Sequence, residues 1–233
     1  MSVQLRAIHT HAFDFWLART SVVVVAGLQL LMINRFALGG RWMAPGLELA
    51  LVIPLSAATA WTQDKARRAS ADHHWHRVAQ WRRAIRGTAL LLTALITMMN
   101  CASLMQLIAA LLDGATKANG HSLLLDAANL WVTNVIAFAL WYWSMDRGGP
   151  ASRGVTLKQV DDFLFPQMTL NLSQPWSPGF VDYLFLSFTN ATAFSPTDTL
   201  PLTPSAKLLM MAESGISLLT IALVAARAVN ILN

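Results

Sequence analysis

Three long stretches without charge constrain this chain most. No Lys, Arg, Asp or Glu occurs over Thr20–Asn34, Gly87–Leu112 or Ala127–Met145. Each is a candidate membrane span, because about 20 apolar residues in a helix cross the hydrocarbon core of a bilayer. Of the 233 residues, 12% are charged and 55% are hydrophobic, whereas about 25% of a soluble domain is charged. These numbers exclude an ordinary water-soluble enzyme and predict an all-α integral membrane protein.

The apolar pattern predicts about five transmembrane helices in three regions. The expected spans are Thr20–Leu38, Pro45–Trp61, Gly87–Leu112, Leu123–Met145 and Pro204–Leu232. Residues 1–146 would form a four-span membrane region, residues 147–176 an extramembrane connector, and residues 177–233 a C-terminal unit. The fourth span closes with Trp141-Tyr142-Trp143, which we interpret as an aromatic belt at the membrane interface.

The most polar part of the chain is the basic segment 64–86. Its apolar residues Trp75, Val78, Trp81 and Ile85 recur at spacings of three and four, which predicts an amphipathic helix lying on the bilayer. Basic residues beside a membrane favour anionic lipid as a partner over nucleic acid. The residues expected to face lipid are Arg67, Arg68, Arg77, Arg82 and Arg83.

The same segment contains three histidines, His73, His74 and His76. Histidine clusters can bind metal, but no carboxylate or cysteine follows at a spacing that completes a site. We therefore favour a solvated basic helix and expect no catalytic residues, no resident metal and no cofactor. A membrane-embedded enzyme that uses these histidines with Asp64 or Asp72 remains an alternative, and it predicts a bound metal.

The C-terminal unit alternates helix and non-helical backbone. Ser177-Pro178 is a typical helix start, and the apolar run that follows to Asn190 is too short to cross a bilayer. Pro196 and Pro201 exclude a continuous helix, and Pro204 begins a long final helix. This order predicts a re-entrant segment, which is tolerated at membrane depth only where protein or water surrounds it.

A series of residues in this unit carries a family resemblance. The series is Asp182-Tyr183-Leu184-Phe185-Leu186-Ser187-Phe188, then Asp198, then Pro201-Leu202-Thr203-Pro204, and finally Ala206, Lys207, Glu213 and Gly215. Over Phe180–Asn233 the chain resembles the two-helix pore domain of tetrameric potassium-type, pore-loop ion channels. The resemblance implies a homotetramer in which residues 123–145 form the outer helix, 178–190 the pore helix and 204–232 the inner helix. The chain is also similar to a set of bacterial membrane proteins with several preceding spans, which implies the bacterial inner (plasma) membrane.

The filter-like segment departs from that family. Where potassium channels carry Thr-Val-Gly-Tyr-Gly, this chain has Ala193-Phe194-Ser195-Pro196-Thr197. Without glycine, and with the fixed φ of proline, the carbonyl stack of the family filter cannot form in the same way. We expect a wider path for monovalent cations, potassium or sodium, lined by Thr192, Ser195, Thr197 and Asp198. The altered filter also supports the alternative, a non-conducting membrane scaffold or interaction protein that retains the pore-domain fold.

Polar residues inside the predicted spans are further candidates. Glu213 is expensive in an apolar helix, so we expect it to have a partner; it either bonds the pore helix or serves the ion path. Gly215 is either a gating hinge or a close helix contact. We expect Asn100, Gln106, Asp126 and Asn134 to form hydrogen bonds between helices.

The membrane orientation is left open by two conflicting signals. An excess of Lys and Arg places the basic segment 64–86 in the cytoplasm, and two spans later the chain is again on that side. The re-entrant segment would then enter from the cytoplasm, whereas potassium channels place their filter outside. Either the basic helix is on the outer face, the pore is inverted, or the number of spans differs from five.

Overall fold

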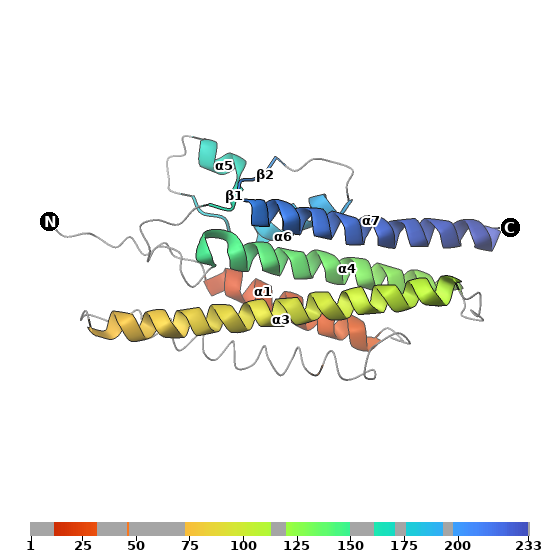
Figure 1. Cartoon of the computed structure of the whole chain (residues 1–233), viewed down its shortest axis with the longest axis horizontal. Coiled ribbons are helices and arrows are strands. Elements are labelled where there is room, and N and C mark those ends of the chain that lie inside the picture. Colours follow the sequence, from red (N-terminus) through yellow and green to blue (C-terminus); the bar gives the residue numbers. More distant parts are fainter. Residues whose placement is uncertain are drawn as a thin grey trace.

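The computed structural model describes residues 12–31, 46, 73–112, 120–149, 161–170, 176–192 and 198–232. The helices are α1 (Ala12–Leu31), α3 (His73–Leu112), α4 (Gly120–Met145), α5 (Pro166–Thr169), α6 (Phe180–Thr192) and α7 (Pro204–Leu232). A short 3-10 helix, η1 (Asp146–Gly148), follows α4, and two strands, β1 (Phe163–Leu164) and β2 (Leu200–Pro201), form the small sheet. The predicted all-α class is confirmed for this part of the chain (Figure 1).

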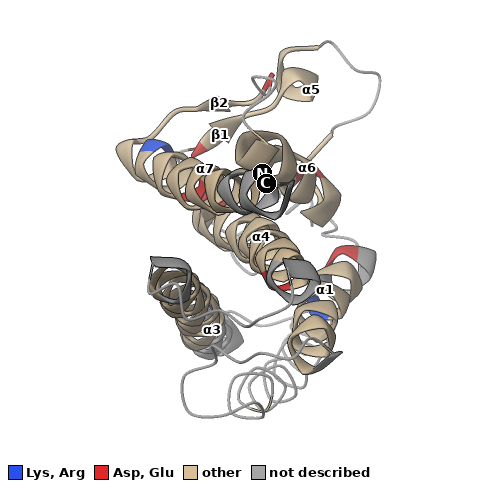
Figure 2. Ribbon diagram, turned by 90° about the vertical axis from the view of Figure 1, so that its right-hand side faces the viewer, with Lys and Arg blue, Asp and Glu red and all other residues tan. Residues whose placement is uncertain are grey.

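Helix α4 is the centre of the bundle. Viewed end-on, it lies between α1, α3, α6 and α7 (Figure 2), and it packs against all four. Six successive residues, Val135–Leu140, are buried. A helix buried at successive positions has neighbours on every side, so α4 is the element against which the others are positioned.

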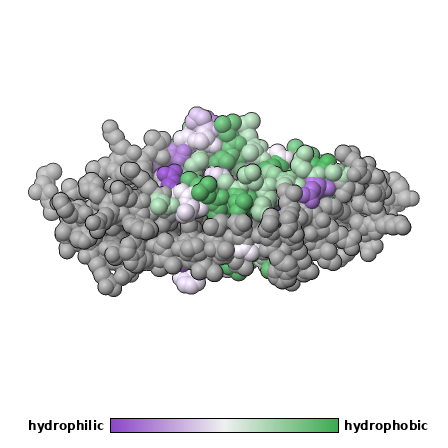
Figure 3. Space-filling view, turned by 60° about the horizontal axis from the view of Figure 1, so that its bottom comes forward, coloured by the Kyte–Doolittle hydropathy of each residue, from purple (hydrophilic) through white to green (hydrophobic). Residues whose placement is uncertain are grey.

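Three of the described helices are long and apolar enough to cross a membrane. The qualifying segments are Arg86–Ala109, Leu124–Gly148 and Pro204–Ala225, and they overlap three of the five predicted spans. Large apolar side chains remain exposed on α3 and α7, namely Leu91, Met98, Met105, Leu208, Met211 and Leu218. On one face of the molecule, the described residues form an apolar area with hydrophilic residues on either side of it (Figure 3). Such a surface is typical of helices in contact with lipid.

The first predicted span begins earlier than expected. Helix α1 starts at Ala12, eight residues before Thr20, and its apolar part, Trp16–Leu30, is shorter than a full span. The polar residues Thr20 and Ser21 are accommodated inside the helix, because their hydroxyls donate to the carbonyls of Trp16 and Leu17 at 2.8 and 2.9 Å. The end of this span and the second predicted span, Pro45–Trp61, lie outside the described residues apart from Gly46.

The basic segment and the third span form one helix. Helix α3 has 40 residues, a length of about 60 Å, and it runs as a continuous rod (Figure 1). Across the junction, the Thr88 hydroxyl donates to the carbonyl of Ala84 at 3.1 Å. Residues 73–86 are helical as expected, but they extend the span along its axis instead of forming a separate helix on the bilayer surface.

Helix α6 lies beside the first half of α7. Strands β1 and β2 pair antiparallel, Phe163 with Pro201 and Leu164 with Leu200, so the chain before α6 meets the chain after it. At the other end of α6, the Asn190 side chain donates to the carbonyl of Met210 in α7 at 3.0 Å. The chain therefore runs beside α7 as helix α6, and at strand β2 it has returned to the start of α7.

The ends of α4 and α6 are set by specific residues. Arg147, Gly148 and Gly149 have φ of 52°, 73° and 84°, and a Cβ on Gly149 would lie 2.7 Å from the carbonyl oxygen of Ser144, so α4 ends sharply there. Helix α6 begins at Phe180 and not at the predicted Ser177-Pro178. Carboxylates accept the N–H groups at this start.

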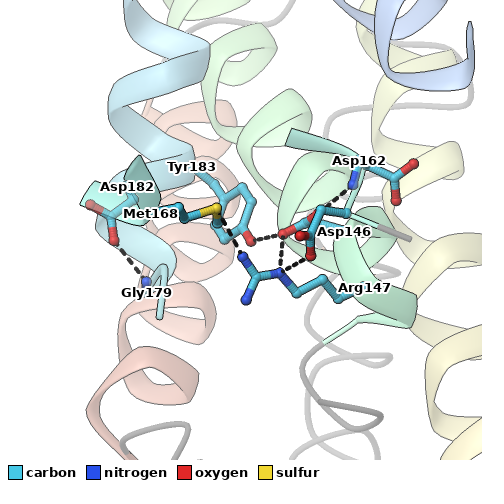
Figure 4. Close-up of polar contacts among 8 residues, drawn as sticks. Asp146, Arg147, Asp162, Met168, Gly179, Asp182 and Tyr183 are labelled. Atoms are coloured by element: carbon cyan, nitrogen blue, oxygen red, sulfur yellow. Dashed lines mark hydrogen bonds and ion pairs between the residues drawn. The ribbon is translucent and has the colours of Figure 1, made fainter. Parts of the chain in front are cut away.

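Those carboxylates come from near and far in the chain. Asp182 accepts the N–H of Gly179 at 2.7 Å (Figure 4), and Asp14 of α1 accepts the N–H of Phe180 at 3.1 Å. A carboxylate at a helix N-terminus satisfies free donors and opposes the helix dipole. Both the start of α6 and its attachment to α1 depend on these bonds.

Candidate functional site: two buried carboxylate clusters

A fully buried acid of α7 connects three helices. Glu213 has no solvent-exposed surface. Its Oε2 accepts the hydroxyl of Tyr142 from α4 at 2.5 Å and the side-chain amide of Asn190 from α6 at 2.6 Å, while its Oε1 contacts the hydroxyl of Ser187, also from α6. We call Glu213, Tyr142, Ser187 and Asn190 the Glu213 cluster. It holds α6 between α4 and α7.

Neighbouring polar groups extend this cluster along α7. The side-chain amide of Asn134 donates to Ser217 Oγ at 2.9 Å and to the backbone carbonyl of Glu213 at 3.3 Å. The Ser214 hydroxyl donates to Asn190 Oδ1 at 3.2 Å. Residues 213 and 217 are four apart, and Ser187 and Asn190 are three apart, so each pair shares one helix face. The local spacing thus presents several polar groups at one three-helix junction.

A second buried acid lies at the end of α4, one turn after Tyr142. Asp146 is also fully buried. Its Oδ2 accepts the hydroxyl of Tyr183 from α6, and its Oδ1 accepts the backbone N–H of Asp162 at 2.9 Å (Figure 4). Arg147 Nε lies 3.6 Å from Asp146 Oδ2 and 2.7 Å from Asp161 Oδ1. We call Asp146, Arg147, Tyr183 and Asp162 the Asp146 cluster.

The Asp146 cluster attaches the connector to the start of α7. Asp162 accepts the hydroxyl of Thr203 at 2.6 Å and, through its backbone carbonyl, the N–H of Leu202 at 2.8 Å. Partial burial raises the pKa of Asp162, and the hydrogen bond from Thr203 opposes that rise. The cluster therefore fixes β1 and β2 beside the end of α4.

The structure places two residues of the filter-like segment. Thr192 is the last residue of α6, half-buried, and its hydroxyl donates to the carbonyl of Thr189 at 2.9 Å. Asp198 is exposed and lies just before β2. Ala193, Phe194, Ser195, Pro196 and Thr197 lie outside the described residues, so their predicted roles stay predictions.

The inner-helix candidates differ from each other. Glu213 forms hydrogen bonds with side chains of α6, which is one of the two roles expected for it. Gly215 is exposed, and an added Cβ would meet no atom within 4 Å, so it makes no close helix contact among the described residues of this chain. A contact with another copy, or a hinge, stays a prediction.

The structure describes some of the candidate residues in the other spans and in the basic segment. Asn100 donates to the carbonyl of Leu130 at 3.2 Å, and with Asn134 it confirms two of the expected bonds between helices. Arg67 and Arg68 lie outside the described residues, and for Arg77, Arg82, Arg83 and the three histidines the helical backbone alone is described. Within the described ranges, no group of three or more His, Cys, Asp or Glu residues could hold a metal ion.

Sequence reasoning missed the roles of Tyr142, Tyr183, Asp146 and Asp14. Tyr142 was expected in an interfacial belt, but it is fully buried. The available signal was composition: the chain has two tyrosines, and a buried tyrosine hydroxyl needs a partner. Here each hydroxyl donates to a buried carboxyl group.

A comparison of the chain with protein-family models, curated proteins and solved structures finds no match.

Proposed function

We propose that the chain is an integral protein of the bacterial inner membrane and a pore-loop, channel-like protein whose homotetramer passes monovalent cations. The observation that supports this most is the path of the chain around α6. The short helix runs beside the first half of α7, and the pairing of β1 with β2 returns the chain to its starting side. A re-entrant helix followed by a loop and an inner helix would have such a path, which supports the proposal.

The length and surface of α6 favour an assembly of several copies. Its 13 residues span about 20 Å, less than the hydrocarbon core of about 30 Å. Val181, Phe185 and Phe188 are 54%, 63% and 48% exposed. A short helix and the non-helical chain after it persist at membrane depth only where protein or water surrounds them. Further copies of this chain would supply that protein.

In such a tetramer, α4 is the outer helix, α6 the pore helix and α7 the inner helix. The ion path would be formed by Thr192–Asp198, with a ring of four Asp198 carboxylates attracting cations at its mouth. The negative end of the α6 dipole at Thr192 would favour the same ions. We assign Glu213 to holding α6 in place and not to the ion path, because the chain itself buries its carboxyl group completely.

The basic segment 64–86 would contact lipid. A helix that extends beyond the span carries its arginines past the hydrocarbon core, where long basic side chains reach anionic headgroups. Arg77, Arg82 and Arg83 lie in the part that α3 includes.

The proposal is tested by ion flux into proteoliposomes that contain the purified protein. We expect potassium or sodium flux above that of protein-free liposomes. At low ionic strength Asp198→Asn should reduce it several-fold, because the Debye length is then about 30 Å. The matched control is Lys207→Gln, which removes an exposed charge of opposite sign in the first turn of α7 and should increase the flux. Both effects should fade at about 1 M salt.

A tetramer by native mass spectrometry is expected in the same preparation. If no flux is found and both variants behave as the unmodified protein does, the pore is contradicted. The non-conducting scaffold is then favoured, and the absence of glycine between Thr192 and Asp198 already gives that alternative a specific basis.

A further inference from the structure

The Glu213 cluster contains one more short contact between polar atoms than the hydrogens of its neutral donors can bridge. We propose that Glu213 carries a proton, so that this junction of α4, α6 and α7 is a proton-binding site formed by a carboxylic acid. The proposal does not depend on whether the protein conducts ions. It follows from the hydrogen-bonding inventory of four side chains.

The Ser187 hydroxyl is the group that is short of hydrogens. Its Oγ lies 2.7 Å from the carbonyl oxygen of Val135 in α4 and also contacts Glu213 Oε1. A serine hydroxyl has a single hydrogen, whereas both neighbours are acceptors if Glu213 is ionised. One of the two oxygen pairs would then face each other with no hydrogen between them. A proton on Oε1 resolves this, because Glu213 then donates to Ser187, and Ser187 donates to Val135.

The other donors of the cluster cannot provide the missing hydrogen. The hydroxyl hydrogen of Tyr142 is used on Oε2. The two amide hydrogens of Asn190 are used on Oε2 and on the carbonyl of Met210. The orientation of this amide is fixed because its nitrogen lies 3.0 Å from the carbonyl oxygen of Met210, which can only accept a hydrogen bond. Rotating the amide would place its oxygen against two other oxygens.

The charges around Glu213 lead to the same conclusion. The groups that contact its carboxyl group are Tyr142 from α4 and Ser187 and Asn190 from α6. All are neutral. Among the described residues, no Lys, Arg or His forms an ion pair with Glu213, whereas Asp146 has Arg147 at 3.6 Å. An isolated buried carboxylate is strongly unfavourable and becomes neutral instead.

The proton has a structural consequence for α6. With the proton in place, Glu213, Ser187 and the carbonyl of Val135 form one chain of hydrogen bonds that joins α7, α6 and α4. Removing the proton leaves a buried anion and breaks one link of this chain. The proton is therefore part of what positions α6.

Infrared difference spectroscopy tests the proposal directly. The spectrum of Glu213→Gln is subtracted from that of the unmodified protein in liposomes at neutral pH. We expect a band of a protonated carboxyl C=O stretch that shifts to lower frequency in heavy water. Asp146→Asn is the matched control, and its difference spectrum should contain the two carboxylate bands. If the Glu213→Gln spectrum contains carboxylate bands instead, the proposal is overturned.

A second variant keeps the test valid if Glu213→Gln does not fold. Ser187→Ala removes the acceptor of the Glu213 hydroxyl while Glu213 remains. We expect the same protonated-carboxyl band to move to higher frequency, because the acid loses its hydrogen-bond acceptor. If this difference spectrum contains no protonated-carboxyl band, the proposal is also overturned.

Discussion

Asp146 and Glu213 are both fully buried acids, and each accepts a hydrogen bond from one of the two tyrosines of the chain. Their remaining partners differ. Asp146 also has a backbone N–H at 2.9 Å and the guanidinium of Arg147 at 3.6 Å. Glu213 has the neutral side chains of Asn190 and Ser187. The same functional group thus occupies a charged environment in one cluster and a neutral one in the other.

The position along the helices explains this difference. Asp146 follows the last residue of α4, where the backbone N–H groups of the connector and the long side chain of Arg147 can reach it. Glu213 is about two and a half turns inside α7, where its carboxyl group contacts side chains of the neighbouring helices. A buried charge is tolerated when it is paired and hydrogen-bonded, and otherwise the group becomes neutral. The comparison predicts different responses to the same substitutions.

The largest difference should come from amide substitutions. Asp146→Asn removes a charge that Arg147 and Tyr183 stabilise, and breaking a buried pair costs about 3 kcal/mol of unfolding free energy. Glu213→Gln replaces a neutral acid by a neutral amide that can still donate to Ser187, so we expect a loss of about 1 kcal/mol or less. Denaturant titration in detergent micelles measures both. Equal losses would contradict the distinction between the two clusters.

Removing the tyrosine hydroxyls should give a smaller difference in the same direction. Tyr183→Phe takes a donor from a charged acceptor, which costs about 2 kcal/mol, whereas Tyr142→Phe takes one from a neutral acid, which costs about 1 kcal/mol. Thermal unfolding of the two variants under identical conditions is the measurement. A larger loss for Tyr142→Phe would indicate that Glu213 is the charged member of the pair.

Local signals in the sequence predicted the elements that carry these clusters. The final helix was expected over Pro204–Leu232 and is observed with those bounds, because a proline starts it and an apolar run continues it. The short helix before it was placed within two residues at each end. The continuity of α3 was missed because amphipathic spacing describes a helix face and not whether the helix bends into the membrane surface.

The partners of the buried acids could not be predicted in this way. Tyr142 and Glu213 are 71 residues apart, and Asp14 and Phe180 are 166 residues apart. Glu213 was recognised as needing a partner, because a lone acid in an apolar helix is costly, but nothing local indicates which helix supplies it. The packing of the helices around α4 determines which helix supplies the partner.

Asp14 offers an intermediate case between the two acids. It is buried and faces the N-terminus of α6, where it accepts the N–H of Phe180. A helix N-terminus supplies partial positive charge, so Asp14→Asn should cost about 1 kcal/mol. Gly179→Ala should cause a similar loss, because its Cβ would lie 2.8 Å from Asp14 Oδ1. Thermal unfolding of each variant is the measurement.

The double variant and a control sharpen this test. Asp14→Asn with Gly179→Ala should lose little more than either substitution alone, since both disturb one contact. Gly215→Ala, where no atom lies within 4 Å of the added Cβ, should cause no loss. Additive losses would show that Gly179 and Asp14 act independently.

The smallest expected effect is a pH dependence at Asp162, a partly exposed acid of the Asp146 cluster. Burial raises its pKa above the ordinary value of about 4, with further upward contributions from Asp146 and Asp161 and opposing ones from Thr203 and Arg86. Between the ordinary and the raised pKa, the folded state binds more protons than the unfolded state. The free energy of unfolding therefore decreases as pH rises through that window.

Asp162→Asn isolates this contribution because the amide oxygen still accepts the Thr203 hydroxyl. The difference in unfolding midpoint between the unmodified protein and the variant is measured from about pH 4 upward. As pH rises, the unfolding midpoint of the unmodified protein should fall relative to that of the variant. The difference should become constant once Asp162 is ionised in both the folded and the unfolded state. Solvent screening at a partly exposed carboxyl keeps the shift small. A difference that moves the other way would mean that Arg86 and Thr203 outweigh burial, so that Asp162 resembles Asp146 in being a stabilised anion.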